Sequence, residues 1–539
     1  MKMVVLCVAT LWVTTKNAPF SDRNKSFQTF LKTFEIASQT KERIIMFYTS
    51  TRSNTELVSA ATIARGIAED GGLFVPVEFP AVTPDFFQRL ADMDYCQRAK
   101  AVLSLYLTDF TADEIEHCVN GAYRGSFENE QPAPVKEVKN GMHLLELWHG
   151  PTCAFKDLAL QLLPYLLTAS ANKTDPGRTK VILVATSGDT GKAALDGFAD
   201  VPGTRIIVFY PVHGVSAMQK LQMQTQTGDN VAVCGIEGNF DDAQSGVKAI
   251  FADQEMMQFL ADKKMDFSSA NSINFGRLVP QIVYYISAYC DLIKQGKIKN
   301  GDSINVCVPT GNFGNILAAY YAKQMGLPVN KFICASNRNN VLTDFINTGV
   351  YDRNRTFHAT TSPSMDILIS SNLERLLYHL YDGDNGAIRQ LMNELRQNGK
   401  YEIRKDVLTR LQKDFYAGYC DDETVTKTIS ALFKNEKYLC DTHTAVAVNV
   451  YEQYTKETGD TTPCIIASTA SPYKFAPAVL PAVYDGALPE DEFAMTETLF
   501  ATTGLPIPAP IASLRGKKVL HPAAIEKSCM SEFIREFLK

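Results

Sequence analysis

The chain has 539 residues, of which 45% are hydrophobic and 21% are charged, close to the average for globular proteins. This composition excludes a disordered chain, a collagen-like repeat or a coiled coil as a description of the whole. The net charge of -6, without a polybasic run, argues against nucleic acid or an anionic membrane as the main partner. Length and composition therefore favour a soluble enzyme of several domains that acts on small molecules.

The twelve cysteines form no C-x-x-C pair, so the sequence predicts neither a zinc ribbon nor a redox pair. Several lie in apolar runs, as Cys307 and Cys334 do. Such thiols usually pack as small buried hydrophobic groups. We therefore expect reduced thiols in a cytosolic protein, and no metal site.

The first 45 residues differ from the rest of the chain. Residues 3–13 form an apolar run too short to span a bilayer, and Lys2 precedes it, as in a signal peptide. No small-residue cleavage pattern follows, and the excess of Lys and Arg in this segment is also typical of a weak transit peptide. We favour a third interpretation, in which the natural start is Met46 and residues 1–45 are an extension outside the mature protein.

A turn and a helix are predicted around Lys156. Gly150 and Pro151 favour the turn, and the apolar spacing of residues 158–166 indicates the helix. At the start of that helix, the dipole and partial burial would both lower the pKa of an amine, as a nucleophile or base requires. A lysine that only extends its ammonium into solvent at a helix end fits the same pattern.

From Lys180 onward, short apolar runs alternate with helical segments such as residues 192–198 and 316–325. The runs cover residues 180–185, 205–210, 231–235, 303–308, 331–335 and 464–467. Parallel strands that are covered by helices on both faces have this pattern. The sequence therefore predicts an α/β fold.

A glycine-rich turn, Thr186-Ser187-Gly188-Asp189-Thr190-Gly191, follows the first of these strands. Ligands in α/β sheets collect where strands end and helices begin, and backbone N–H groups there bind anions. The turn is not a Walker A loop, because Thr186 replaces its first glycine and Ala193 replaces the hydroxyl residue that binds Mg²⁺. An anion-binding loop and an ordinary capping turn both remain open.

A second turn, Pro309-Thr310-Gly311-Asn312-Phe313-Gly314-Asn315, also joins a strand to a helix. Its glycines and asparagines suit a nest of backbone donors around a phosphate. It lacks the G-x-G-x-x-G pattern, so a dinucleotide fold is not supported. An asparagine-rich helix N-cap is an equally good explanation.

Further along, residues 367–433 are rich in helix formers and charge, which predicts a helical insertion.

Eight motifs follow one another along the chain: Tyr48-Thr49-Ser50-Thr51-Arg52, residues 70–76, residues 149–157, residues 187–191, Asn271-Ser272-Ile273-Asn274 with Arg277, residues 311–315, residues 362–368 and residues 468–475. In this order they resemble threonine synthases, which are pyridoxal-phosphate-dependent enzymes of the tryptophan-synthase-β type. Any single motif is weak, but eight in order are highly specific. The resemblance implies a two-lobed α/β fold, with an N-terminal subdomain at residues 46–130 and a catalytic region at residues 131–539.

The resemblance implies the residues that bind the cofactor, pyridoxal phosphate. Lys156 would be the catalytic lysine, joined to the cofactor as a Schiff base and able to move protons at the substrate's Cα and Cβ. Thr469 would meet the pyridine nitrogen, where a hydroxyl leaves that nitrogen unprotonated. The cofactor phosphate would lie in the loop of Gly311, Asn312, Phe313, Gly314 and Asn315.

The resemblance also implies two substrate anion sites. For the substrate phosphate we expect Arg277, with Asn274 and Ser272 as weaker candidates and Lys192 as an alternative. Asp189 would cap the following helix through backbone N–H groups, because an acidic group beside a carboxylate is unfavourable. The substrate α-carboxylate would bind the loop of Ser187, Gly188, Asp189, Thr190 and Gly191.

The implied activity is threonine synthase, which converts O-phospho-L-homoserine and water to L-threonine and phosphate by γ-elimination and β-addition. A phospho-lyase of the same fold that yields a 2-oxoacid is the alternative. A non-catalytic paralogue is disfavoured, because Lys156 and the phosphate loop are both present. We expect a cytoplasmic monomer or homodimer with no nucleic-acid or membrane partner and no control by S-adenosylmethionine.

Overall fold

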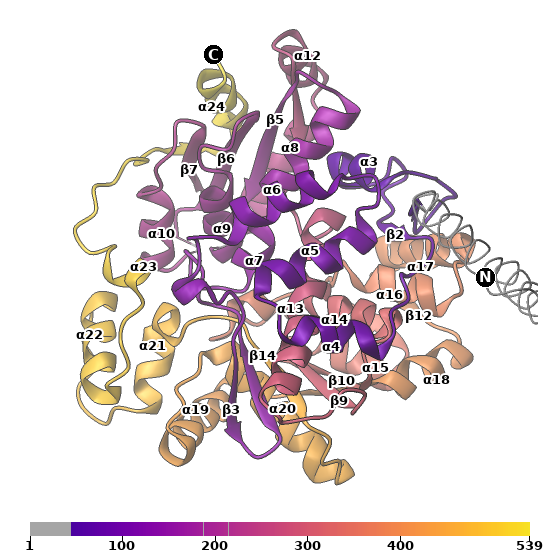
Figure 1. The fold of residues 1–539 in the computed structure, drawn as a ribbon. Helices are drawn as coiled ribbons and strands as arrows, with labels where there is room; N and C mark the ends of the chain where they lie inside the picture. The colour runs from indigo at the N-terminus through magenta and orange to yellow at the C-terminus, as the bar shows by residue number, and fades with distance from the viewer. Residues whose placement is uncertain (1–44, 187, 214) are drawn as a thin grey trace, which may run out of the picture. The chain divides into compact units, whose positions relative to one another are not determined.

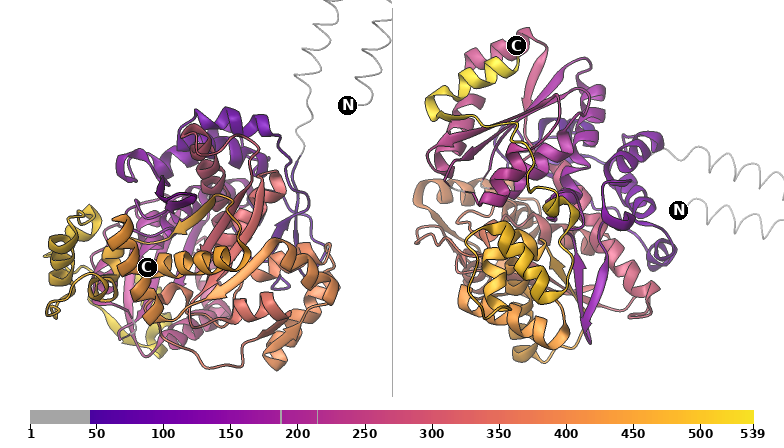
Figure 2. Two further views of the ribbon diagram at one scale, coloured as in Figure 1. Left: turned by 90° about the horizontal axis from the view of Figure 1, so that it is seen from below. Right: turned by 90° about the vertical axis from the view of Figure 1, so that its left-hand side faces the viewer.

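The computed structural model describes residues 45–539 except residues 187 and 214, so the predicted extension lies almost wholly outside the described residues. Met46–Lys539 form one compact unit. Two sheets organise this unit, one around β5, β6 and β7 and the other around β9 and β14 (Figure 1). Helices surround both sheets in the two further views (Figure 2).

The first lobe contains a six-stranded sheet in the order β13-β10-β9-β14-β4-β3. Its strands run parallel except β3, which pairs antiparallel with β4 at one edge. Every residue of β9 and β14 is buried, which explains why these strands are continuous apolar runs in the sequence. The bounds are β3 (Val135–Lys139), β4 (Met142–Glu146), β9 (Ile304–Pro309), β10 (Val329–Ser336), β13 (Phe415–Tyr419) and β14 (Cys464–Ser468).

The second lobe contains a five-stranded sheet in the order β15-β7-β6-β5-β8, and all its pairs are parallel. The six strands predicted from apolar runs divide equally, three into each sheet, and the predicted α/β fold is confirmed. The bounds are β5 (Thr179–Ala185), β6 (Thr204–Pro211), β7 (Val231–Glu237), β8 (Met265–Ser268) and β15 (Ala524–Glu526).

The N-terminal part of the unit is mainly helical. Asp94 and Thr111 begin α5 and α6 with capping boxes, in which each side chain accepts from a backbone N–H three residues on. Strands β1 and β2 pair antiparallel. The bounds are β1 (Tyr48–Ser50), α3 (Ser59–Arg65), β2 (Phe74–Pro76), α4 (Pro84–Ala91), α5 (Tyr95–Tyr106), α6 (Ala112–Tyr123) and η1 (Glu128–Glu130).

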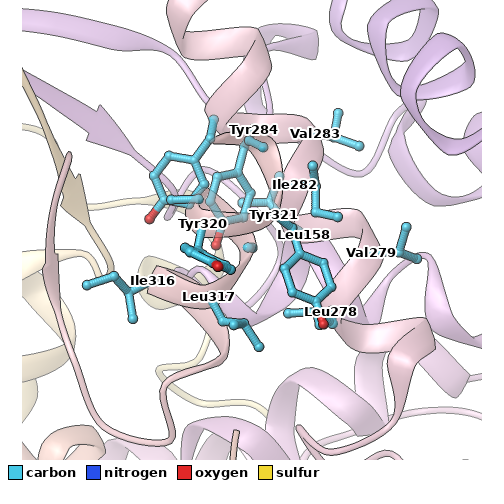
Figure 3. Packing of buried hydrophobic residues seen from close by; sticks show 14 of the residues in the cluster. Leu158, Leu278, Val279, Ile282, Val283, Tyr284, Ile316, Leu317, Tyr320 and Tyr321 are labelled. Atoms are coloured by element: carbon cyan, nitrogen blue, oxygen red, sulfur yellow. The ribbon is translucent and has the colours of Figure 1, made fainter. Parts of the chain in front are cut away.

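One long helix, α13 (Phe275–Lys294), runs through the core and is buried over most of its length. Asn274 begins it, because the Asn274 Oδ1 accepts from the Gly276 N–H at 2.8 Å. Figure 3 shows α13 packed against α14 (Gly314–Met325) and α7 (Lys156–Leu160), with Leu278, Val279, Ile282, Ile316, Leu317 and Leu158 among the contacting side chains. This core fixes the relative positions of three helices at whose starts predicted site residues lie: Lys156 of α7, Arg277 of α13 and Asn315 of α14.

The segment predicted as a helical insertion contains four helices and two strands. Its strand β13 joins the edge of the six-stranded sheet beside β10, because the short sequence Phe415-Tyr416-Ala417-Gly418 is largely buried. Strand β12 pairs antiparallel with β11. The bounds are β11 (Val350–Asp352), α16 (Leu373–Leu380), α17 (Asn385–Asn398), β12 (Lys400–Glu402), α18 (Lys405–Asp414) and α19 (Asp422–Glu436).

The remaining elements cover the two sheets and the C-terminal region. They are α8 (Leu163–Thr174), α9 (Asp189–Phe198), α10 (Ala217–Gln224), α11 (Phe240–Phe251), α12 (Gln254–Asp262), α15 (Val341–Thr348), η2 (Pro363–Met365), α20 (Thr442–Thr458), η3 (Pro472–Phe475), α21 (Ala476–Val479), η4 (Leu480–Ala482), α22 (Glu492–Thr503), α23 (Ala509–Ala512), η5 (Lys527–Cys529) and α24 (Met530–Phe537). Among the described residues, no helix has both the length and the apolar character to cross a membrane. The described cysteines, Cys96 to Cys529, are all free thiols.

Candidate active site

Lys156 is the first residue of α7 and lies beside the end of β14. The Phe155 N–H donates to the Thr469 carbonyl at 2.8 Å, and the Ser471 N–H donates to the Cys153 carbonyl at 3.1 Å. These two bonds bring together segments that are far apart in the sequence. Thr469 is buried, and its hydroxyl makes no hydrogen bond to another residue of the described part. The structure therefore places two predicted cofactor residues side by side.

The Lys156 amine is a much weaker base than an ordinary lysine. Burial lowers its pKa to about 8; the Asp189 carboxylate opposes the shift, and the nearby charges of Lys474 and Arg277 add to it. The Nζ donates to the Ser364 hydroxyl at 3.3 Å. About a tenth of the amine is therefore neutral at pH 7, far more than for an ordinary lysine, and the neutral amine is the form that nucleophilic chemistry requires.

The acidic neighbour of Lys156, Asp189, is held by a second lysine, Lys474, for which the sequence predicted no role. The Lys474 Nζ lies 2.7 Å from the Asp189 Oδ1, and both side chains are buried. Gln219 donates to the same oxygen at 3.0 Å, and Lys474 also donates to the Thr152 carbonyl at 2.8 Å. Burial alone would raise the pKa of Asp189, but the ammonium groups of Lys474 and Lys156 outweigh burial and hold it well below its usual value. Asp189 is therefore a carboxylate in a buried ion pair.

This pairing corrects the predicted capping role of Asp189. Gly188 occupies the N-cap of α9, no side chain caps that helix, and Asp189 is already the first helical residue. The Asp189 side chain instead bonds with Lys474 and Gln219. These bonds compensate part of the hydration that the carboxylate loses on burial.

The loop before α9 is shaped by Thr186 and Gly188. The Thr186 hydroxyl accepts from the N–H groups of Gly188 and Gly191 at 3.0 and 2.9 Å. Gly188 has φ of 142°, and a Cβ there would lie 2.5 Å from the Gln219 side chain, so only glycine fits. The N–H groups of Asp189 and Thr190 have no acceptor among the described residues, as an anion site at a helix start would need, and Ser187 lies outside the described residues.

Arg277 is a buried cation without a carboxylate partner in the described part of the chain. One guanidinium nitrogen donates to the Ala270 carbonyl at 2.8 Å, while the buried Nε has no partner among these residues. Burial lowers the pKa of Arg277 to about 10, which still leaves it charged. A buried charge without a counter-ion is costly, so this guanidinium is prepared for an incoming anion.

The other phosphate candidates are occupied by structural contacts. The Asn274 oxygen caps α13, and its amide nitrogen donates to the carbonyls of Ile63 and Ser269 at 3.1 and 3.4 Å, which leaves no free donor. The Lys192 ammonium lies 3.1 Å from the Asp196 carboxylate and also donates to Gln226. Their assignment to the substrate phosphate stays a prediction, and the geometry favours Arg277.

The loop from Gly311 to Asn315 lies between β9 and α14 and carries no charged side chain. Phe313 holds a left-handed backbone with φ of 64° while buried, which turns the chain sharply into the helix. The backbone N–H groups of residues 311–315 have no acceptor among the described residues. The Asn315 Oδ1 accepts from Tyr284 at 2.8 Å and from Tyr285, while its buried Nδ2 has no described partner. Such a ring of free neutral donors at a helix start fits a phosphate.

Sequence reasoning missed a buried dyad behind Ser364. The Ser364 N–H donates to the His443 Nε2 at 3.2 Å, and the His443 Nδ1 lies 2.8 Å from the Asp441 carboxylate. Nε2 is thus the acceptor, and the ring proton is on Nδ1. The Ser364 carbonyl packs against Gly311, where a Cβ would lie 2.6 Å from it. The dyad therefore fixes Ser364 between Lys156 and the phosphate loop, and only the motif around Ser364 signalled this region.

Comparison with protein families agrees with this geometry. Residues 130–469 match the family described as pyridoxal-phosphate dependent enzyme. Residues 47–123 match the threonine synthase N terminus, and residues 444–499 match the threonine synthase C-terminal region. The matches cover both lobes and the N-terminal helices.

Known proteins resemble the chain to different extents. Threonine synthase-like 1 from Homo sapiens is 41% identical over 480 residues, which cover 87% of this chain and 62% of that protein. The chain therefore spans less than two thirds of that relative's length. Threonine synthase from Schizosaccharomyces pombe is 36% identical over 490 residues, which cover 82% of this chain and 94% of the relative.

Solved structures show the same architecture. Pyridoxal-phosphate-bound threonine synthase from Brucella melitensis has a TM-score of 0.82 and 35% identity, covering 92% of this chain and all of that one. Threonine synthase from yeast also has a TM-score of 0.82, with 31% identity over 91% of this chain and 98% of that one.

Proposed function

This chain belongs to the threonine synthase family of pyridoxal-phosphate-dependent enzymes, and from this premise we propose that it converts O-phospho-L-homoserine and water to L-threonine and phosphate. Pyridoxal phosphate is its cofactor. The observation that carries the substrate proposal is Arg277, a buried guanidinium near Lys156 without a carboxylate partner in the described part. A substrate that brings a phosphate dianion would neutralise it.

The residues present fit the cofactor. Lys156 supplies an amine whose pKa of about 8 suits covalent attachment to the cofactor aldehyde. The free N–H groups of residues 311–315 and the unpaired Asn315 amide would hold the cofactor phosphate. The Thr469 hydroxyl would meet the pyridine nitrogen as a neutral partner. The bound cofactor supplies an electron sink for negative charge that develops on the substrate carbon skeleton.

The chain's own groups would orient the substrate at two anion sites. The free N–H groups of Asp189 and Thr190, at the start of α9, would bind the α-carboxylate. Arg277 would bind the phosphate and favour its departure, because its charge stabilises the dianion that leaves. Fixing both ends of a short substrate places Cα and Cβ in one orientation.

Lys156 would carry the proton transfers. Its amine can accept a proton near neutral pH, because burial and the charges of Lys474 and Arg277 lower its pKa more than the Asp189 carboxylate raises it. The Ser364 hydroxyl, 3.3 Å from the Nζ, orients the amine. Proton transfer at Cα and Cβ by a positioned base is the catalytic work that the protein itself must supply.

A phospho-lyase that gives a 2-oxoacid and ammonia is the second candidate, because the relatives with 41% identity are described as threonine synthase-like. Both reactions consume one water and release one phosphate, so phosphate release does not separate them. Incubation of the holoenzyme with O-phospho-L-homoserine, followed by amino-acid analysis and a 2-oxoacid assay, does. Threonine as the main product supports the proposal, and a 2-oxoacid with ammonia replaces it by the second candidate.

A further inference from the structure

A separate cavity of about 440 Å³ lies beside α9, walled by that helix, by the end of α10 and by residues 510–520. Lys156, Arg277 and Lys474 do not line it. Its volume is within the range of cavities that bind small molecules. The cavity therefore has the dimensions of a ligand site and its own set of residues.

The lining of this cavity is positively charged. Lys192 and Asp196 of α9 neutralise each other across 3.1 Å, and Gln226 accepts a further bond from Lys192. Lys517 and Lys518 also line the cavity, and neither has a carboxylate partner among the described residues. Both side chains are exposed, and two consecutive lysines without a carboxylate partner in the described part favour a dianion.

An amide in the wall lacks a hydrogen bond. Gln222 is 1% exposed and lines the cavity, and its side-chain oxygen has no partner among the described residues. A buried acceptor without a donor costs free energy that a ligand hydroxyl would recover. The oxygen is buried, so a ligand hydroxyl would reach it once the Gln222 amide turns toward the cavity, and that bond would satisfy the acceptor.

Hydrogen bonds hold the wall of the cavity that residues 510–520 form. The N–H groups of Leu520 and His521 both donate to the Gln224 carbonyl, at 2.8 and 3.0 Å. The His521 Nε2 lies 2.9 Å from the Gln226 carbonyl. These bonds tie the backbone just after Lys517 and Lys518 to the end of α10, so the backbone of this wall needs little reorganisation to bind a ligand.

We propose that this cavity binds a small phosphate monoester that also carries a hydroxyl group. The phosphate dianion pairs with Lys517 and Lys518, and the hydroxyl donates to Gln222. The site is distinct from the Lys156 site but shares α9 with it, since Lys192 lies one helical turn after Asp189. A ligand here therefore contacts the helix whose first turn would bind the substrate carboxylate.

The test is calorimetric titration of the holoenzyme with glycerol 3-phosphate. This probe has the required dianion and hydroxyls, and it has neither the amine nor the carbonyl that would react with the cofactor or with Lys156. The double variant K517A/K518A is compared with K294A/K299A, which removes two exposed lysines that do not line the cavity. Glycerol alone is the uncharged control ligand.

We expect glycerol 3-phosphate to bind the unmodified protein and the K294A/K299A variant equally, and K517A/K518A at least about tenfold more weakly. In Q222M, affinity for glycerol 3-phosphate should fall severalfold while affinity for methyl phosphate, which has no hydroxyl, should not. Absence of binding to the unmodified protein at about 10 mM would overturn the proposal. So would equal binding to K517A/K518A, which would place the ligand elsewhere, for example at Arg277.

Discussion

The two regions that we propose as anion sites are built from different chemistry. The loop of residues 311–315 offers backbone N–H groups and one amide, without a charged side chain. The region around Lys156 gathers three cations, of which Asp189 compensates one and Arg277 has no counter-ion in the described part. A neutral, preorganised loop suits a phosphate that stays bound. An uncompensated charge suits a phosphate that arrives with the substrate and leaves as product.

The largest expected effect on activity is at Lys156, in the second of these regions. Lys156→Ala should reduce threonine formation by at least about 10³-fold, because no other described amine replaces the nucleophile and base. Product assay and the visible absorbance of bound cofactor measure this. Lys427→Ala, which removes an exposed lysine paired with Glu423, is the control. Retention of both activity and cofactor absorbance in Lys156→Ala would contradict the assignment.

The next largest effect concerns the buried ion pair. Lys474→Met should lower the free energy of unfolding by about 3–5 kcal/mol, because it removes the ammonium that pairs directly with the buried Asp189 carboxylate. Denaturant unfolding measures the loss. Lys427→Met removes an exposed lysine paired with Glu423 and should cost less than about 1 kcal/mol. If the two variants are equally stable, the pair at Asp189 is not the buried charge pair described here.

A substitution at Arg277 separates the two regions. Arg277→Leu should raise the KM for the phosphorylated substrate by about 10²-fold, because a buried charge-assisted contact is lost, and Arg277→Lys should recover part of it. Cofactor affinity, measured by absorbance titration of the apoenzyme, should stay unchanged. An equal loss of cofactor affinity would show that the two anion sites are not independent.

Gly311→Ala should change cofactor affinity and leave the substrate KM unchanged, the reverse of Arg277→Leu. The new Cβ would lie 2.6 Å from the Ser364 carbonyl, so the loop must shift, and cofactor affinity should fall about tenfold. Substrate KM at saturating cofactor should change little. Gly386→Ala, in the open helix α17, should alter neither quantity. Unchanged cofactor affinity in Gly311→Ala would remove this loop from the cofactor site.

The lowered pKa of Lys156 predicts how the rate of cofactor attachment depends on pH. Covalent attachment needs the neutral amine, whose fraction rises with pH and levels off above the pKa of about 8. The rate of cofactor attachment to the apoenzyme should therefore rise about tenfold between pH 7 and pH 9 and then flatten. An ordinary lysine would give a rise of about 10²-fold without a plateau, and stopped-flow absorbance distinguishes the two.

Local sequence patterns predicted most of the fold because they arise from local physics. Apolar runs marked the buried parallel strands, and glycine-rich turns marked the starts of α9 and α14. The same patterns predicted Lys156 as the first residue of its helix. The order of the motifs then predicted that the turn before α14 binds the cofactor phosphate and the turn before α9 binds the substrate carboxylate.

The sequence could not predict contacts that only the folded chain creates. Asp189 and Lys474 lie in segments far apart in the sequence, and no local pattern around either residue predicts that they pair. The sequence therefore predicted that Asp189 caps α9. His443 follows an ordinary helix N-cap, Asp441, and its bond to Ser364 depends on how α20 meets η2. Long-range pairing of buried polar groups is set by tertiary packing rather than by local preference.

The most direct test of the account is the reaction of the holoenzyme with O-phospho-L-homoserine in ¹⁸O-enriched water. Elimination breaks the bond between Cγ and oxygen, and water then adds at Cβ. The account predicts threonine that carries the label and phosphate that does not. A 2-oxoacid with ammonia in place of threonine, or homoserine with labelled phosphate, would contradict it.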